Sequence, residues 1–109
     1  MTWYVLTITP RQERFVRDAV TELRDDRGEP LNLAAYYPLH TTAATGVRKQ
    51  AKRVRPLMPG YVFIEMPEEA PWMAVRAIRG VTGYVGGAEG PRAVSEAEIG
   101  LLITKEANH

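Results

Sequence analysis

A chain of 109 residues with 45% apolar and 25% charged side chains has the size and composition of one folded domain. It contains no cysteine, which excludes a disulfide framework, a thiol nucleophile and any thiolate metal site. Its first residues lack the features of a secretory signal, and no apolar run approaches the roughly 20 residues of a membrane-spanning helix. We therefore expect a single domain over residues 1–109, located in the cytoplasm and without membrane association.

The net charge of +1 conceals an uneven distribution along the chain. Residues 1–29 carry five Lys and Arg against six Asp and Glu, residues 30–64 carry five against none, and residues 65–109 carry four against seven. The central cations are Arg48, Lys49, Lys52, Arg53 and Arg55. Such a cluster is typical of a surface that meets phosphate or an acidic partner, and equally of a solvated hairpin face. Charge alone leaves both interpretations open.

The first part of the chain predicts a strand followed by a helix. Residues 3–9 are rich in aromatic and β-branched side chains, which indicates a central strand. Thr9 is placed to cap a helix with Pro10 in its first turn, and Gly28 is placed to end it. The apolar face expected for this helix consists of Phe15, Val16, Ala19, Val20 and Leu23.

The middle of the chain predicts two strands separated by an extension. Residues 33–39 indicate a strand, residues 40–47 a mobile loop, and residues 47–55 one arm of a hairpin that carries the basic cluster. Residues 60–66 give the clearest strand signal of the chain.

The last part predicts a helix, a strand and a second helix. Residues 71–79 indicate a short helix, residues 81–85 a strand and residues 86–91 a turn, and a capping box of Ser95 and Glu98 opens a helix through Ile103. The whole order predicts an α+β fold. In it, a mostly antiparallel four-stranded sheet is flanked by about three helices and extended by a basic hairpin.

The sequence offers little for catalysis. His40 lies in a loop of Thr and Ala, His109 is the last residue of the sequence, and neither has an acidic neighbour. Capping explains Ser95, and a position just before a helix explains Glu68 and Glu69. We expect no enzymatic activity, no metal and no cofactor.

The strand of residues 60–66 provides a candidate docking surface. Side chains alternate along a strand, so Tyr61 and Phe63 share one face while Val62 and Ile64 share the other. We assign Val62 and Ile64 to the core. The face with Tyr61 and Phe63 is either a docking surface or more core.

Five short groups of residues occur along the chain in a recognisable order. They are Trp3-Tyr4-Val5, Pro59-Gly60-Tyr61-Val62-Phe63, Trp72 with Val75-Arg76, Gly80-Val81-Thr82-Gly83-Tyr84-Val85-Gly86, and Ser95 with Glu98-Ile99. Each group alone is weakly specific, but the ordered set extends from Trp3 to about Leu102. As a set it resembles the NusG amino-terminal (NGN) domain family, either a bacterial or phage-type NusG or an RfaH-like paralogue.

The resemblance implies a transcription elongation and antitermination factor that is a monomer when free. Family members dock on the clamp helices of the largest subunit of bacterial RNA polymerase, reach toward the second-largest subunit, contact the non-template DNA strand and suppress pausing. Carried over by position, the clamp-binding depression comprises Met58, Pro59, Tyr61, Phe63, Tyr84 and Val85. The second polymerase contact comprises Trp72 and Met73. The nucleic-acid contacts comprise Arg11, Arg14, Arg76 and Arg79, with Arg48, Lys49, Lys52 and Arg53 of the basic cluster.

Two departures from the family pattern bear on function. Ala77 and Ile78 stand where some family members read DNA bases with an Asn-Thr pair, which argues against the same sequence-specific recognition of pause sites. No KOW domain follows the final helix. We expect either a shortened form of a longer protein or a stand-alone domain such as a phage or mobile element could encode. In both cases we expect this chain to lack the recruitment of further factors that the KOW domain provides in family members.

A different class of function remains as an alternative. A basic hairpin beside a sheet could bind RNA of a transcript or a ribosome, with residues 48–55 on phosphates and Tyr36, Tyr37 or Tyr61 stacked on bases. A binding experiment with isolated clamp helices separates this RNA-binding alternative from the role as a polymerase-bound elongation factor.

Overall fold

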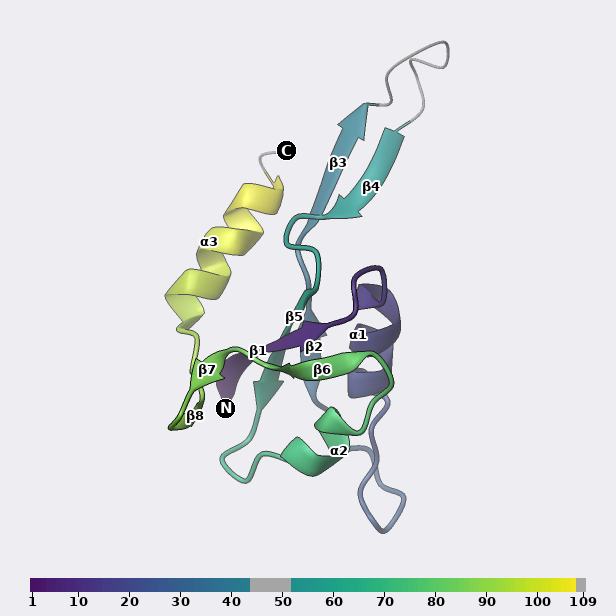
Figure 1. Cartoon of the computed structure of the whole chain (residues 1–109), viewed down its shortest axis with the longest axis vertical. Helices are drawn as coiled ribbons and strands as arrows, with labels where there is room; N and C mark the ends of the chain where they lie inside the picture. Colours follow the sequence, from purple (N-terminus) through teal and green to yellow (C-terminus); the bar gives the residue numbers. More distant parts are fainter. Residues whose placement is uncertain (44–51, 108–109) are drawn as a thin grey trace.

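The computed structural model describes the backbone of residues 1–43 and 52–107, and the side chains of residues 1–39 and 56–103. Four strands form an antiparallel sheet in the order β2-β5-β1-β6 (Figure 1). Their bounds are β1 Thr2–Ile8, β2 Ala34–Tyr36, β5 Tyr61–Met66 and β6 Val81–Tyr84. The predicted α+β fold with a central first strand is therefore confirmed. Among the described helices, none is long and apolar enough to cross a membrane.

Strand alternation divides the core into two parts, one on each face of the sheet. On one face Leu6 lies opposite Val62 and is fully buried beneath α1 (Glu13–Thr21) and α2 (Trp72–Arg76), together with Val16 and Val75. On the other face Val5 lies opposite Phe63, and both pack with Ile99 of α3 (Glu96–Ala107). Figure 1 shows α3 on the far side of the sheet from α1. The smaller second core is therefore shared by the sheet and one helix.

The first helix is shorter at both ends than the sequence predicts. Residues 9–12 form a turn in which Gln12 N–H donates to the Thr9 carbonyl at 3.1 Å, and Arg11 has a φ of 75°, which a helix does not accept. At the other end the Asp25 carboxylate accepts hydrogen bonds from the N–H groups of Arg27 and Glu29. This local side-chain bonding competes with helix formation, so the expected cap at Gly28 belongs to a separate turn.

One residue of the predicted apolar face lies outside the core. Val16 and Val20 are fully buried, whereas Phe15 is 49% exposed. Successive helix residues are rotated by about 100°, so a buried stripe that runs through Glu13, Val16 and Val20 leaves Phe15 on the outer side.

The second half of the chain follows the prediction more closely. The capping box is confirmed, because Glu98 N–H donates to Ser95 Oγ at 3.1 Å and Ser95 N–H donates to Glu98 Oε2 at 3.2 Å. The helix α2 ends at Arg76 rather than Arg79, since Ile78 N–H bonds to Val75 and tightens the chain into a turn. The predicted turn at 86–91 is a small hairpin of β7 (Gly86–Gly87) and β8 (Gly90–Pro91).

A second hairpin projects away from the sheet (Figure 1). It pairs β3 (Leu39–Ala43) with β4 (Lys52–Pro56), so the predicted loop at 40–47 begins as a strand. The rest of that loop, with Arg48 and Lys49, lies outside the described residues. The predicted hairpin arm is confirmed where the structure describes it, over β4.

A buried carboxylate connects this hairpin to the sheet and to the first helix. Glu13 is 3% exposed, and its Oε2 accepts the Gly60 N–H at 2.9 Å. The Gly60 carbonyl accepts the Ile8 N–H at 2.9 Å, and the φ of 87° at Gly60 suits glycine. Three segments therefore meet at one residue.

We predict that Glu13→Ala lowers the free energy of unfolding by about 1 to 3 kcal/mol, because it leaves the part-buried Gly60 N–H without its acceptor. Glu13→Gln retains an acceptor and loses less. Urea denaturation measures both, with Glu22→Ala, an exposed carboxylate that follows the same helix, as control. Equal midpoints for Glu13→Ala and Glu22→Ala would refute the assignment.

Candidate functional site

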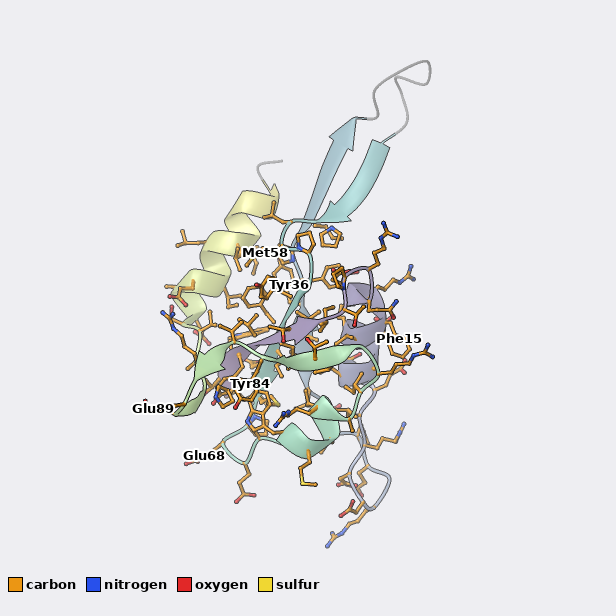
Figure 2. The ribbon with its side chains drawn as sticks, viewed as in Figure 1. Phe15, Tyr36, Met58, Glu68, Tyr84 and Glu89 are labelled. Atoms are coloured by element: carbon orange, nitrogen blue, oxygen red, sulfur yellow. The ribbon has the colours of Figure 1, made fainter. Side chains whose placement is uncertain are left out.

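An apolar groove of about 680 Å³ lies between the sheet and α3. Figure 2 shows Met58 and Tyr36 beside α3, on its side facing the rest of the domain. The side chains that line the groove are Val5, Met58, Tyr61, Phe63, Val85, Arg92, Val94, Glu98, Leu101 and Leu102. Most of them are apolar, with one cation and one carboxylate among them. Such a composition suits a partner with apolar anchors and a polar rim.

The floor and rim of the groove differ in burial. Val5 and Phe63, paired across β1 and β5, are 7% and 3% exposed and form the floor. Tyr61 lies two residues along the same strand and is 37% exposed. Its N–H donates to the Met58 carbonyl at 3.3 Å, which holds the segment before β5 against the rim. Tyr61 is therefore accessible, whereas Phe63 is mainly core.

Four of the six residues predicted for one depression line this groove: Met58, Tyr61, Phe63 and Val85. Pro59 is exposed beside them in the chain. Tyr84 is not in the groove, because neighbouring residues of an extended segment face opposite ways. Its ring lies 5.6 Å from the ring of Trp72, on the face of the sheet that α2 covers.

The wall formed by α3 is the part that the sequence did not reveal. Glu98, Leu101 and Leu102 of α3 line the groove, while Ile99 is 5% exposed and anchors the helix. The apolar spacing of Ile99 and Leu102 indicates a face that packs on a sheet. It does not indicate which face of the sheet.

The residues predicted for a second contact have different environments. The Trp72 ring lies 5.1 Å from Tyr4, edge to face, and 5.6 Å from Tyr84, so it is part of an aromatic cluster. The guanidinium of Arg76 lies 5.6 Å from the Tyr84 ring centre. Met73 is 90% exposed. Of this group, Met73 is therefore the side chain that a partner would meet first.

Three of the predicted nucleic-acid contacts, Arg11, Arg14 and Arg79, lie around the start of α1, whereas Arg76 is on α2 beside Tyr84. Arg11 and Arg14 line a cleft of about 490 Å³ with Arg17, Tyr37 and the base of the β3-β4 hairpin. Arg79 lies at a turn held to the start of α1 by a 2.8 Å hydrogen bond from the Thr9 N–H to the Gly80 carbonyl. Within the described part of the chain, the ion pair is Arg17 with Asp18 at 3.1 Å, and Arg11, Arg14 and Arg79 have no acidic partner.

The basic hairpin is described only in part. Lys52 and Arg53 lie on β4, and Arg48 and Lys49 fall outside the described residues. Of the tyrosines considered for RNA stacking, Tyr37 is 8% exposed and Tyr36 packs against the second core, so Tyr61 is the most accessible of the three. In the described residues, no three His, Asp or Glu side chains gather as metal ligands.

Comparison with known proteins gives a consistent match. The family model described as "Transcription termination factor nusG" matches residues 1–103. "Transcription termination/antitermination protein NusG" of Rickettsia felis is 28% identical over 99 residues, which cover 89% of this chain and 52% of that protein. The protein of the same name from Helicobacter pylori is 28% identical over 112 residues, covering 99% of this chain and 63% of its own.

A solved structure titled "Domain interaction in Thermotoga maritima NusG" superposes with a TM-score of 0.62 at 25% identity, over 99% of this chain and 58% of the other. The chain thus spans between about half and two thirds of the length of these relatives.

We predict that Phe63→Ala and Tyr61→Ala differ strongly in their effect on folding. Phe63→Ala should lower the free energy of unfolding by about 3 to 5 kcal/mol, since it opens a cavity beneath α3. Tyr61→Ala should cost clearly less, because its ring is already part-exposed. Denaturant titration of both variants compares them. Equal losses would show that the rim is as buried as the floor.

Proposed function

The chain belongs to the NusG family, and from that premise we propose that it is a non-enzymatic transcription elongation and antitermination factor that binds RNA polymerase and suppresses pausing. We propose that the groove between the sheet and α3 docks on the clamp helices of the largest polymerase subunit. The convergence of Met58, Tyr61, Phe63 and Val85 on one apolar groove is the observation that supports this most.

The groove has the features of a surface with a few dominant anchors. Aromatic and apolar side chains at the centre of an interface contribute most of the binding free energy, and the rim contributes mainly by excluding water. Tyr61 and Met58 supply accessible apolar area. Arg92 and Glu98 supply one charge of each sign, which would orient a helical partner.

We propose a second polymerase contact at Met73, with Trp72 as the residue that positions it. The exposure of Met73 and the packing of Trp72 between Tyr4 and Tyr84 support this division. The groove and Met73 belong to opposite faces of the sheet. A domain with this arrangement can bridge the two large subunits.

We further propose that the arginines around α1 contact the non-template DNA strand. Arg11, Arg14 and Arg79 have no acidic partner in the described part of the chain, so their charges are available to phosphates. Ala77 offers no hydrogen-bonding side chain, and Ile78 packs against the first core. The contact should therefore be largely independent of sequence.

The RNA-binding alternative has less support. It needs stacking platforms beside the hairpin, and the burial of Tyr37 and the packing of Tyr36 against the second core remove two of the three that were considered.

We predict that Tyr61→Ala weakens binding to a purified clamp-helix fragment by tenfold or more, on the order of 1.4 kcal/mol or above, as expected for an accessible aromatic anchor. Met73→Ala, an exposed apolar change on the other surface, should bind the fragment normally. Calorimetric titration at physiological salt gives both affinities. Unchanged binding by a folded Tyr61→Ala protein would exclude the groove as the docking site.

We predict that Arg79→Gln preserves fragment binding and reduces pause suppression on polymerase complexes with an intact transcription bubble. Arg79 is exposed and lies three residues beyond the end of α2, so its charge contributes little to folding and the melting temperature should change little. Single-round elongation assays measure the pausing. Full pause suppression by the variant, with no crosslink from position 79 to the non-template strand, would remove Arg79 from the DNA contact.

A further inference from the structure

Phe15 is an aromatic side chain for which the fold has no evident use. It is 49% exposed and belongs to neither part of the core, although it stands next to the fully buried Val16. Within the described part of the chain its ring meets no other aromatic ring. Figure 2 shows it on the outer side of α1, away from the sheet. The exposed half of the side chain contributes no apolar burial to the fold and is accessible to a ligand.

Two arginines come from the segments nearest to this ring's position on α1. Arg14 precedes Phe15 in the helix and lines the cleft toward the hairpin. The turn at Gly80 packs on the same helix: a Cβ at Gly80 would lie 3.3 Å from Val16 and 3.4 Å from Gln12. Arg79 is the residue before Gly80. The surface of α1 around Phe15 therefore receives cations from two different parts of the sequence.

The nearby carboxylates leave these cations free. Asp18 is paired with Arg17 at 3.1 Å, and the Glu13 carboxylate is buried against the Gly60 N–H. In the described residues, neither Arg14 nor Arg79 forms an ion pair or a side-chain hydrogen bond. An exposed ring in the same region as free guanidinium groups suits a ligand that combines a flat aromatic group with negative charges.

We infer that Phe15 is a stacking platform for a base of single-stranded nucleic acid, with Arg14 and Arg79 on the phosphates to either side. Each base of such a strand has a flat face, so stacking tolerates any sequence, and the flanking phosphates match the nearby cations. Bases in a duplex are already stacked on each other and cannot use the ring. The inference rests on the proposed function for the identity of the strand, which is the displaced non-template DNA.

The test measures binding of the full chain to a short fluorescent oligothymidylate by anisotropy over a range of salt concentrations. Phe15→Ala should weaken binding by about 5- to 30-fold and leave the salt dependence unchanged, because it removes stacking and no charge. Phe15→Trp should bind at least as well as the original. Arg14→Gln should instead lower the salt slope by about one phosphate contact. Ile103→Ala, an apolar change at a similarly exposed position on α3, is the matched control and should bind normally.

An oligomer of the same length with abasic sites distinguishes binding through base stacking from binding to the sugar-phosphate backbone alone. The original protein should bind it about as weakly as Phe15→Ala binds oligothymidylate, and Phe15→Ala should lose nothing more on it. The inference is overturned if a folded Phe15→Ala protein binds oligothymidylate like the original, or if its loss is the same on both oligomers. Phe15→Leu, which keeps apolar bulk without a π face, replaces Phe15→Ala if thermal melting shows that the alanine variant is unfolded.

Titration of the original protein and of the same variants with the clamp-helix fragment tests the proposed polymerase binding separately from the stacking platform. Phe15→Ala should bind the fragment normally. If Phe15→Ala weakens oligothymidylate binding but the original protein does not bind the fragment, the polymerase role is contradicted and the stacking platform is supported. If the original protein binds the fragment but Phe15→Ala binds oligothymidylate normally, the stacking platform is contradicted and the polymerase role is supported.

Discussion

The hydrogen bond from the Gly60 N–H to the buried Glu13 carboxylate is the constraint on which the arrangement of the molecule depends. It fixes the point at which the chain leaves the hairpin and enters β5, and the Ile8 N–H bonded to the Gly60 carbonyl ties that point to the end of β1. A carboxylate so deeply buried is tolerated only because it has a partner. Through one residue, the start of α1, the base of the hairpin and the rim of the groove take fixed relative positions.

The division of the sheet into two faces follows from the same strand. Leu6 and Ile8 of β1 pack under α1 and α2, and Val5, the residue before Leu6, packs toward α3. Because the first core has most of the fully buried side chains, it contributes most of the hydrophobic stabilisation of the fold. The second core is small, with Val5, Phe63 and Ile99 as its buried members, and leaves apolar surface open. The less filled side of the sheet is therefore the side that holds the groove.

Local signals predicted the elements, and contacts between distant residues decided what the sequence missed. The strand at Tyr61–Met66 and the capping box of Ser95 and Glu98 depend on neighbouring residues and were predictable. The start of α1 depends on Thr9 bonding to Gly80, some 70 residues away, which no local pattern records. Tyr84 was misplaced relative to the groove because the pairing of β1 with β6 shifts register between Thr7 and Ile8, and because a one-residue step reverses the face. The wall formed by α3 was not predicted because the face of the sheet on which α3 packs is also decided by contacts between distant residues.

The attachment of α3 gives the two sides of the groove unequal stiffness. The floor is part of a four-stranded sheet, and we expect its amide protons to be among the most protected of the domain. Up to Ile103, where the side chains of α3 are described, the wall is held by the buried Ile99, the partly buried Leu102 and the Ser95 cap, and the Val94 N–H before it bonds to the Trp3 carbonyl at 2.7 Å. We expect such a helix to open locally at a free energy below that of global unfolding. The groove is thus a rigid template with one compliant edge, whose width adjusts to an occupant without disturbing the fold beneath it.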